Sequence, residues 1–225
     1  VIGRSLNESK SLSVREYNCH RFELVFNKGF LFYCEFNLRL FFFLLFSNSD
    51  LFLSNDLDTL LPNFIVAKLK KKTLIYDSHE LFSEVPELKN RFFVKKIWLL
   101  IERICLPRLK KSYTVSNSIA AYYNQQYGLQ MSVVRNLPLM KEVTKKKHNS
   151  IKKIIYQGAI NKDRGIDLMI SSMQYINAKL YIIGAGDLLD EMIQYTNHLQ
   201  LQKKVIFLGQ MHFEELFDIT QNADL

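Results

Sequence analysis

The sequence contains few cysteines and lacks several motifs that mark common classes of enzyme. Its three cysteines, Cys19, Cys34 and Cys105, are odd in number and widely spaced, and no CxxC pattern accompanies them. These features exclude a disulfide framework and a cysteine-based zinc site, and they favour a reducing cytoplasm. The P-loop motif, HExxH and GxSxG are also absent. The chain is therefore neither a P-loop protein, nor an HExxH zinc protease, nor a serine hydrolase with a nucleophile elbow.

Long apolar runs are scarce as well, with one exception. Hydrophobic residues make up 48% of the 225 residues and charged residues 23%, which excludes a disordered chain and allows a substantial core. The exception runs from Phe30 to Phe46, and Glu35, Asn37 and Arg39 are its strongly polar residues. This run is at the short end of the ~17–25 residues that a membrane-spanning helix needs. We favour a buried or half-buried helix over an interfacial helix, and both over a true span.

Basic residues outnumber acidic residues and give a formal net charge of +8. This charge favours an anionic partner, which could be nucleic acid, anionic lipid or a phosphorylated substrate. Lys68, Lys70, Lys71 and Lys72 form one basic cluster at the end of an expected helix. We interpret this cluster as a solvated helix end rather than as a binding patch for lipid or nucleic acid.

Strand and helix patterns alternate along the chain. Strands are expected at 51–53, 74–76, 112–115 and 132–135, and helices at 57–69, 92–106 and 117–127. After a lysine-rich stretch, strands follow at 154–156, 180–183 and 205–208, with helices at 166–176, 187–198 and 213–221. Residues 21–26 could be a further strand, and residues 1–20 show no clear periodicity. Short connections between alternating strands and helices predict parallel sheets and an α/β fold.

The lysine-rich stretch divides the chain. We expect an α/β unit at 1–139, a linker at 140–150 and a second α/β unit at 151–225. Local signals also fix some helix ends. Ser116 and its neighbours provide an N-cap for the helix at 117–127, Gly128 lies just past its end, and Pro107 breaks the helix before it.

Titratable residues are concentrated directly after the expected strand at 74–76. They are Asp77, His79, Glu80, Glu84 and Glu87. Side chains that follow such a strand lie at the carboxyl edge of the sheet, where open α/β folds bind ligands. A metal site is poorly supported, because Asp-x-His-Glu lacks the HExxH spacing and no second histidine is near. His79 is either a residue that contacts substrate or handles protons, or a structural histidine that makes hydrogen bonds.

Two glycine-containing turns follow strands in the second unit. The turn from Gly158 to Gly165 precedes a helix and carries Lys162 and Arg164. It is either an anion site at a helix N-terminus or an ordinary loop with exposed charges. The turn at Gly184-Ala185-Gly186 lets a ligand approach the backbone closely. It lacks the third glycine of a dinucleotide fingerprint, since that position is Leu189.

Several of these segments occur together in a known family. The segments are Tyr76 to Phe82, Thr114 to Ser118, Arg135-Asn136, Gly158 to Gly165, Leu180 to Gly186 and Val205 to Gly209. In their order and spacing, residues 50–225 resemble the group 1 glycosyltransferases (glycosyltransferase family 4).

The resemblance implies a GT-B fold of two Rossmann-like domains that face a cleft, both partial in this chain. It implies a retaining, metal-independent transfer of a sugar from a nucleotide-sugar donor to a glycan or lipid-linked acceptor, without a cofactor. His79 resembles the family histidine that reaches the transferred sugar, and Asp77 and Glu80 would lie on the acceptor side. The residues that would bind the donor are Gly158, Lys162, Arg164, Gly165, Gly184, Gly186, Gly209 and Gln210.

The sequence also departs from the family pattern. Ala159 stands where an arginine is common, and Arg164 stands where the family usually has a lysine. The glycine-rich loop of the N-terminal domain and the paired glutamates of the donor site are not found, so we expect a fragment. Two alternatives stay open: a non-catalytic GT-B-like binding or scaffold protein, and an enzyme of the sugar-nucleotide 2-epimerase type. We expect a cytoplasmic protein with possible peripheral contact with an anionic membrane and no nucleic-acid partner.

Overall fold

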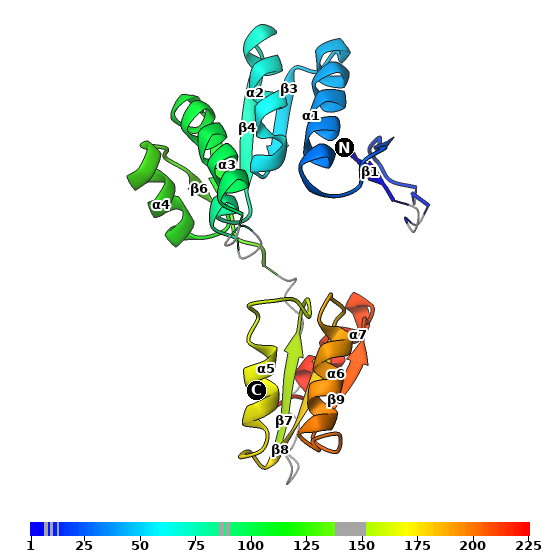
Figure 1. Ribbon diagram of the computed structural model, residues 1–225. Coiled ribbons are helices and arrows are strands. Elements are labelled where there is room, and N and C mark those ends of the chain that lie inside the picture. The colour runs from blue at the N-terminus through cyan, green and yellow to red at the C-terminus, as the bar shows by residue number, and fades with distance from the viewer. Residues whose placement is uncertain (7–8, 10, 13, 86–87, 89–90, 138–151) are drawn as a thin grey trace. The chain divides into compact units, whose positions relative to one another are not determined.

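The computed structural model describes residues 1–225 except 7–8, 10, 13, 86–87, 89–90 and 138–151 (Figure 1). The chain divides into two compact units, residues 1–138 and 139–225. The linker expected at 140–150 lies outside the described residues. Each unit is built around its own parallel sheet.

The first unit contains a four-stranded parallel sheet in the order β3-β4-β5-β6. Its strands are β3 (Leu51–Asn55), β4 (Thr73–Ser78), β5 (Ser112–Thr114) and β6 (Ser132–Val133). Helices α2 (Leu60–Leu69), α3 (Phe92–Cys105) and α4 (Asn117–Tyr127) connect them, with 3₁₀ turns η1 (Leu57–Thr59), η2 (Phe82–Glu84) and η4 (Leu106–Arg108). Because neighbouring strands are parallel and follow in chain order, all carboxyl ends lie at one edge and all amino ends at the other.

Local chemistry explains where the helices of this unit end. The Ser116 hydroxyl accepts a hydrogen bond from the Ile119 amide at 3.3 Å, and Gly128 adopts a left-handed conformation with φ of 67°. Both predicted ends of α4 are thus confirmed. Helix α3 ends at Cys105, and Pro107 lies in the following 3₁₀ turn.

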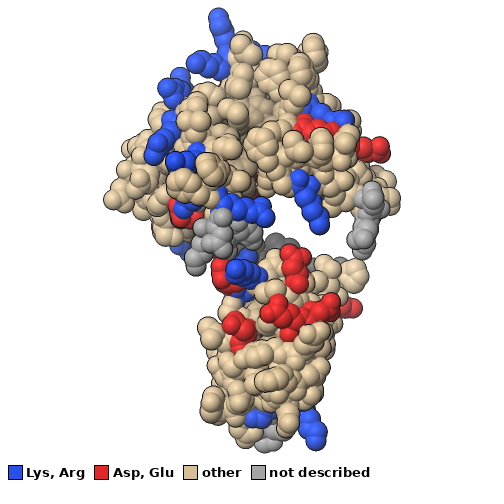
Figure 2. All heavy atoms as spheres, in the orientation of Figure 1, with Lys and Arg blue, Asp and Glu red and all other residues tan. Residues whose placement is uncertain are grey.

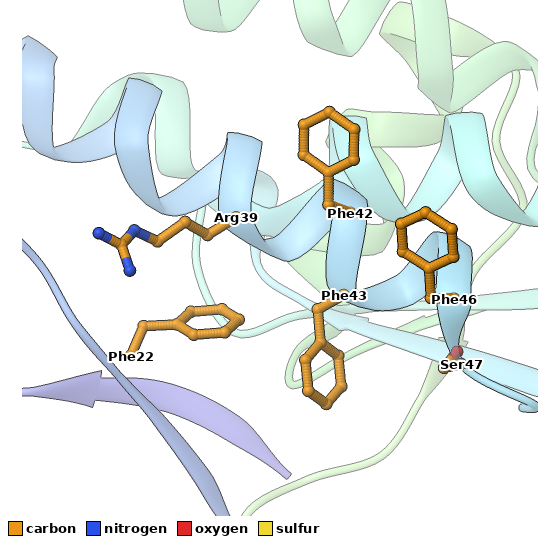
Figure 3. A pocket seen from close by; sticks show the side chains of 6 residues that line it. All are labelled: Phe22, Arg39, Phe42, Phe43, Phe46 and Ser47. Carbon is orange, nitrogen blue, oxygen red and sulfur yellow. The ribbon is translucent and has the colours of Figure 1, made fainter.

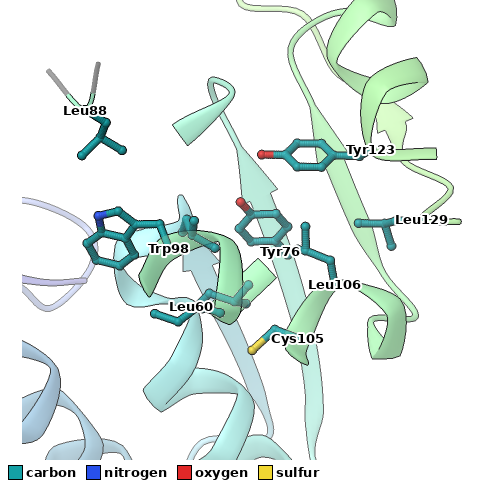
Figure 4. Packing of buried hydrophobic residues seen from close by; sticks show 10 residues of the cluster. Leu60, Tyr76, Leu88, Trp98, Cys105, Leu106, Tyr123 and Leu129 are labelled. Carbon is teal, nitrogen blue, oxygen red and sulfur yellow. The ribbon is translucent and has the colours of Figure 1, made fainter. Parts of the chain in front are cut away.

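The core of the first unit lies between the sheet and its helices (Figure 4). Tyr76 of β4 is fully buried and packs in one cluster with Leu60 of α2, Trp98 of α3 and Tyr123 of α4. Side chains alternate between the two faces of a strand. The next residue of β4, Asp77, therefore points to the opposite face of the sheet.

Helix α1 (Gly29–Phe46) packs beside α2 through one face only. Its buried residues Phe36, Leu40 and Leu44 contact a cluster that includes Phe52 and Val66. By length and composition α1 could cross a membrane, with a mean hydropathy of 1.5 over a window that is 17% buried. Core helices of soluble proteins meet the same criterion. The structure confirms a helix over this run. The preference for a soluble helix over an interfacial helix or a span stays a prediction.

The N-terminal residues contain a strand that the sequence pattern missed. Strand β1 (Ile2–Ser5) pairs in parallel with β2 (His20–Glu23). Residues 1–20 show no periodicity that predicts this strand, because pairing with β2 and not a local alternation of residues stabilises it.

The second unit contains a three-stranded parallel sheet in the order β7-β8-β9. The strands are β7 (Lys152–Gln157), β8 (Ala178–Ile183) and β9 (Val205–Gly209), and the helices are α5 (Ile166–Ser172), α6 (Leu189–His198) and α7 (Phe213–Gln221). Helix α5 is shorter than predicted. A turn in which the Tyr175 amide donates to the Ser172 carbonyl at 3.0 Å ends it, so Ile176 does not continue its buried face.

Candidate functional site

In the first unit, β3, β4 and β5 end next to one another at the carboxyl edge. The register pairs Asn55 with Asp77 and Asp77 with Tyr113. Paired residues of neighbouring strands point to the same face. Asp77 and Tyr113 therefore share the face of the sheet opposite to the Tyr76 core.

A hydrogen-bond network holds His79 at this edge. Its Nε2 lies 2.9 Å from Asp77 Oδ2, and the Tyr113 hydroxyl donates to the same oxygen at 2.8 Å. The His79 amide donates to Asp56 Oδ1 at 2.9 Å, and the Asp56 amide donates to the Asp77 carbonyl at 2.8 Å. The imidazole is thus fixed through both its ring and its backbone, with 45% of the side chain exposed. Nδ1 has no hydrogen-bond partner among the described residues.

Carboxyl groups make this edge electronegative. Burial, reinforced by the charge of Asp56, raises the pKa of Asp58 to about 6. Burial also raises the pKa of Asp56, although the His79 amide opposes the shift. Burial and the neighbouring Asp77 raise the pKa of the Tyr113 hydroxyl. The second oxygen of Asp77, Oδ1, is buried without a hydrogen-bond partner in the described part of the chain. Such an edge suits ligands that donate hydrogen bonds, as sugar hydroxyls do.

The residues predicted at this edge separate into two groups. Asp77 and His79 are brought together, and the side chain of the exposed Glu80 lies near enough to Asp58 to affect its pKa. Glu84 turns away and pairs with Lys95 at 2.7 Å. Glu87 lies outside the described residues.

The sequence analysis missed Asp56, Asp58 and Tyr113 at this edge. Asp56 directly follows β3 and Asp58 lies in the next turn, η1, so a strand end followed by carboxylates could have indicated them. Tyr113 gave no signal, because only the register of β4 and β5 places it against Asp77. Among the residues that the structure describes, no group of three His, Cys, Asp or Glu side chains could hold a metal ion.

In the second unit, three glycines meet where the strands end. The Gly158 amide donates to the Ile183 carbonyl at 3.0 Å, and the Gly184 amide donates to the Gly209 carbonyl at 2.9 Å. A Cβ atom at Gly184 would lie 1.9 Å from the Gly158 carbonyl oxygen. Only glycine allows this approach, so the turns after β7, β8 and β9 form one continuous backbone surface.

Further hydrogen bonds join the loop after β7 to the turn after β8. The Ile160 amide donates to the Ala185 carbonyl at 3.0 Å, and the Asp187 amide donates to Asn161 Oδ1 at 3.1 Å. A Cβ atom at Gly186 would lie 2.4 Å from the Ile160 carbonyl oxygen. Asn161 was not predicted as a site residue. It joins the two turns through its hydrogen bond with the Asp187 amide.

The two cations of the predicted donor site lie on the same loop. Lys162 and Arg164 are exposed, and Gly165, with φ of 68°, begins α5. Gln210 is exposed directly after Gly209. The structure therefore brings Gly158, Gly184 and Gly209 together, while the two cations extend into solvent. Helix α5 has only seven residues, which limits the contribution of its dipole.

Residues 140–225 match the family model described as glycosyl transferases group 1. Over these residues, which lie within the second unit, the chain is similar to the group 1 glycosyl transferases. It is also 33% identical over 78 residues to an uncharacterized glycosyltransferase of Methanocaldococcus jannaschii, a match that covers 33% of this chain and 20% of the relative.

Solved structures resemble the chain across both units. Sucrose-phosphate synthase of Thermosynechococcus elongatus matches with a TM-score of 0.60 at 17% identity. The match covers 86% of this chain and 52% of the synthase chain. HepE of Anabaena, solved with UDP and glucose, matches with a TM-score of 0.59 at 14% identity, over 92% of this chain and 59% of the HepE chain. TarM of S. aureus, solved with UDP, matches with a TM-score of 0.59 at 13% identity, over 83% of this chain and 38% of the TarM chain.

These similarities show the GT-B fold predicted from the sequence. The chain spans a fifth of the length of the curated relative and 52% of the length of the synthase structure.

Proposed function

We propose that this chain is part of an enzyme that transfers a sugar from a nucleotide-sugar donor to a glycan or lipid-linked acceptor. The observation that carries the proposal is the backbone surface of Gly158, Gly184 and Gly209, which lies within the residues that match the family. A surface without side chains lets the diphosphate and ribose of a donor approach the backbone closely.

The loop after β7 would supply the positive charge for the donor diphosphate. Lys162 and Arg164 are exposed on this loop, and an Arg side chain can hold a phosphate through two hydrogen bonds. Ala159 contributes no charge, so these two residues would provide the cationic contact. HepE and TarM, which share the fold, have been solved with UDP, and this supports a nucleoside diphosphate sugar as donor.

In the transfer, the bond between the anomeric carbon and the diphosphate oxygen breaks, and its electron pair goes to the diphosphate. Lys162 and Arg164 would stabilise the charge that develops there. They would do so without a metal ion. The acceptor hydroxyl passes its proton to the departing diphosphate as its oxygen bonds the anomeric carbon, with retained configuration. We assign His79 to the transferred sugar, because Asp77 fixes its ring and Nδ1 stays available. Asp77 and Glu80 would lie on the acceptor side.

A turnover assay tests this function and its alternatives. The protein is incubated with UDP- and GDP-sugars and a panel of glycan and lipid-linked acceptors, and nucleoside diphosphate release and the anomeric proton of the product are followed by NMR. We expect acceptor-dependent release and a product with the configuration of the donor. Release with an epimerised free sugar would indicate an epimerase-type enzyme, and binding without release would indicate a non-catalytic protein.

The free cysteines fit our placement of the enzyme in the cytoplasm.

A further inference from the structure

Two basic segments that are far apart in the sequence meet at one end of the first unit. Six cations line a single pocket of about 450 Å³, and no acidic residue of the described ranges lines it. They are Lys68, Lys71 and Lys72 at the end of α2, and Arg108, Lys110 and Lys111 before β5. Figure 2 shows Lys and Arg side chains standing out where α2 ends. We call this region the basic end.

Little of this positive charge is neutralised. The Lys72 ammonium lies 2.6 Å from Asp50 Oδ1, and Arg108 donates to the Ile104 carbonyl. The side chains of Lys68, Lys71, Lys110 and Lys111 are exposed and form no ion pair within the described residues. Four exposed cations around one hollow require an anionic partner or a shell of counterions.

Apolar side chains lie beside the basic end. The Lys70 ammonium donates to the carbonyls of Leu44 and Ser47, which ties the last turn of α1 to the end of α2. Phe46 is 80% exposed in that last turn, and Leu69 is 63% exposed at the end of α2. Figure 3 shows Phe42 and Phe46 on the same side of α1, with Phe43 on the other side near Phe22.

These aromatic residues border a second hollow. Together with Arg39, they line a pocket of about 530 Å³. The end of the unit therefore presents phenyl rings and a leucine next to a group of cations.

We propose that the basic end docks on an anionic lipid bilayer. The cations would bind phosphate headgroups, while Phe46 and Leu69 would enter the boundary with the acyl chains. Charge complementarity favours an anionic partner, and the exposed apolar side chains favour lipid over a soluble polyanion or nucleic acid, which would leave them in water. The proposal locates the membrane contact expected from the sequence.

The position of this surface suits an enzyme that works at a membrane. Lys72 precedes β4 and Lys111 precedes β5, so the basic end lies at the amino edge of the sheet. His79 and Asp77 lie at the opposite, carboxyl edge. Docking would leave the candidate site open to the solution. The proposal does not depend on sugar transfer, because vesicle binding is measured without a donor.

Flotation with lipid vesicles tests the role of the cations. The protein is mixed with vesicles of phosphatidylcholine alone or with 30% phosphatidylglycerol. We expect binding only to the anionic vesicles and a steep loss with added salt. The double variant Lys68→Gln/Lys111→Gln should bind about 25-fold more weakly, at about fivefold for each cation removed. Lys203→Gln, an exposed lysine of the second unit, should bind like the parent protein.

A matched pair of apolar variants separates lipid from soluble polyanions. Phe46 and Phe93 are 80% and 81% exposed, and of the two only Phe46 lies beside the basic end. Phe46→Ser should weaken vesicle binding about tenfold, and Phe93→Ser should not; neither should change the affinity for soluble polyphosphate. Thermal denaturation should confirm that both variants fold. The proposal is wrong if the parent protein does not bind anionic vesicles, if Phe46→Ser binds them normally, or if Phe93→Ser loses as much affinity.

Discussion

At the scale of single residues, the orientation of His79 depends on Asp77. Removing the charge in Asp77→Asn should weaken the 2.9 Å contact to Nε2 and leave the orientation of the ring undefined. Loss of a carboxylate that orients a metal-binding histidine typically costs 10–100-fold in activity, and by analogy we expect kcat for sugar transfer to fall about 10–100-fold. KM for the donor should change little, since the donor would bind in the second unit.

The matched control for this substitution is Asp50→Asn, which removes a carboxylate that pairs with Lys72 on the surface. Its kcat should equal that of the parent protein. An unchanged kcat in Asp77→Asn would show that His79 needs no such support, and would leave it a structural residue. A loss of thermal stability in Asp77→Asn without a loss of kcat would also indicate that His79 is a structural residue.

The buried carboxyl of Asp58 predicts a pH dependence of stability. Its pKa in the folded protein is about 6, above the ordinary value of 3.8. Between these values the unfolded chain loses the proton more readily than the folded protein does. The free energy of unfolding should therefore fall as pH rises from about 4 to 6. Asp58→Asn removes this penalty, and should be more stable than the parent protein at pH 7.5 by about 1–3 kcal/mol.

Urea denaturation at pH 4 and pH 7.5 measures the difference. The two proteins should differ little at pH 4 and diverge at pH 7.5. Asp50→Asn should show no gain at pH 7.5, because Lys72 lowers the pKa of Asp50. A constant difference between Asp58→Asn and the parent protein at both pH values would contradict the assigned pKa.

Residues at one strand end could be predicted from the sequence, whereas contacts between strands could not. Asp77 and His79 follow a recognisable buried strand, so their place at the sheet edge follows from local pattern. Tyr113 contacts Asp77 only because β4 and β5 pair in one particular register. That register depends on packing across the sheet, and no pattern near Tyr113 reports it.

At the scale of elements, the glycine turns of the second unit contain a position, Gly184, that should not tolerate a side chain. In Gly184→Ala the new Cβ would lie 1.9 Å from the Gly158 carbonyl oxygen. Because the obstacle is backbone and not a flexible side chain, the two turns would have to separate. We expect a loss of stability of about 3 kcal/mol or more, measured by urea denaturation. Gly3→Ala is the control, since its Cβ would meet nothing within 4 Å. Equal stability of the two variants would contradict the contact.

The alternation of strands and helices was predictable because each element carries its own apolar period. Caps such as Ser116 and Gly128 are also local signals. The errors arose where distant residues decide the outcome. Strand β1, for example, exists through its pairing with β2. The early end of α5 is a different kind of error, because a turn of its own backbone causes it.

At the scale of the whole molecule, net charge gave the sign of the expected partner but not its location. The sequence favours a solvated helix end for the lysines at 68–72, because cations suit the C-terminus of a helix. The parallel pairing of β4 and β5 brings Lys110 and Lys111 to the same pocket. The first unit thus carries cations at the amino edge of its sheet and carboxylates at the carboxyl edge.

The central claim is that the turns of the second unit bind a nucleotide-sugar. The most direct test is calorimetry with UDP, GDP and their sugar conjugates, on the parent protein, Arg164→Ala and Lys203→Ala. We expect micromolar binding of one nucleotide series by the parent protein. Arg164→Ala should bind about 10–100-fold more weakly, because it loses a charged hydrogen bond, and Lys203→Ala should bind like the parent protein. Absence of binding to every nucleotide, or equal binding by Arg164→Ala, would contradict the claim.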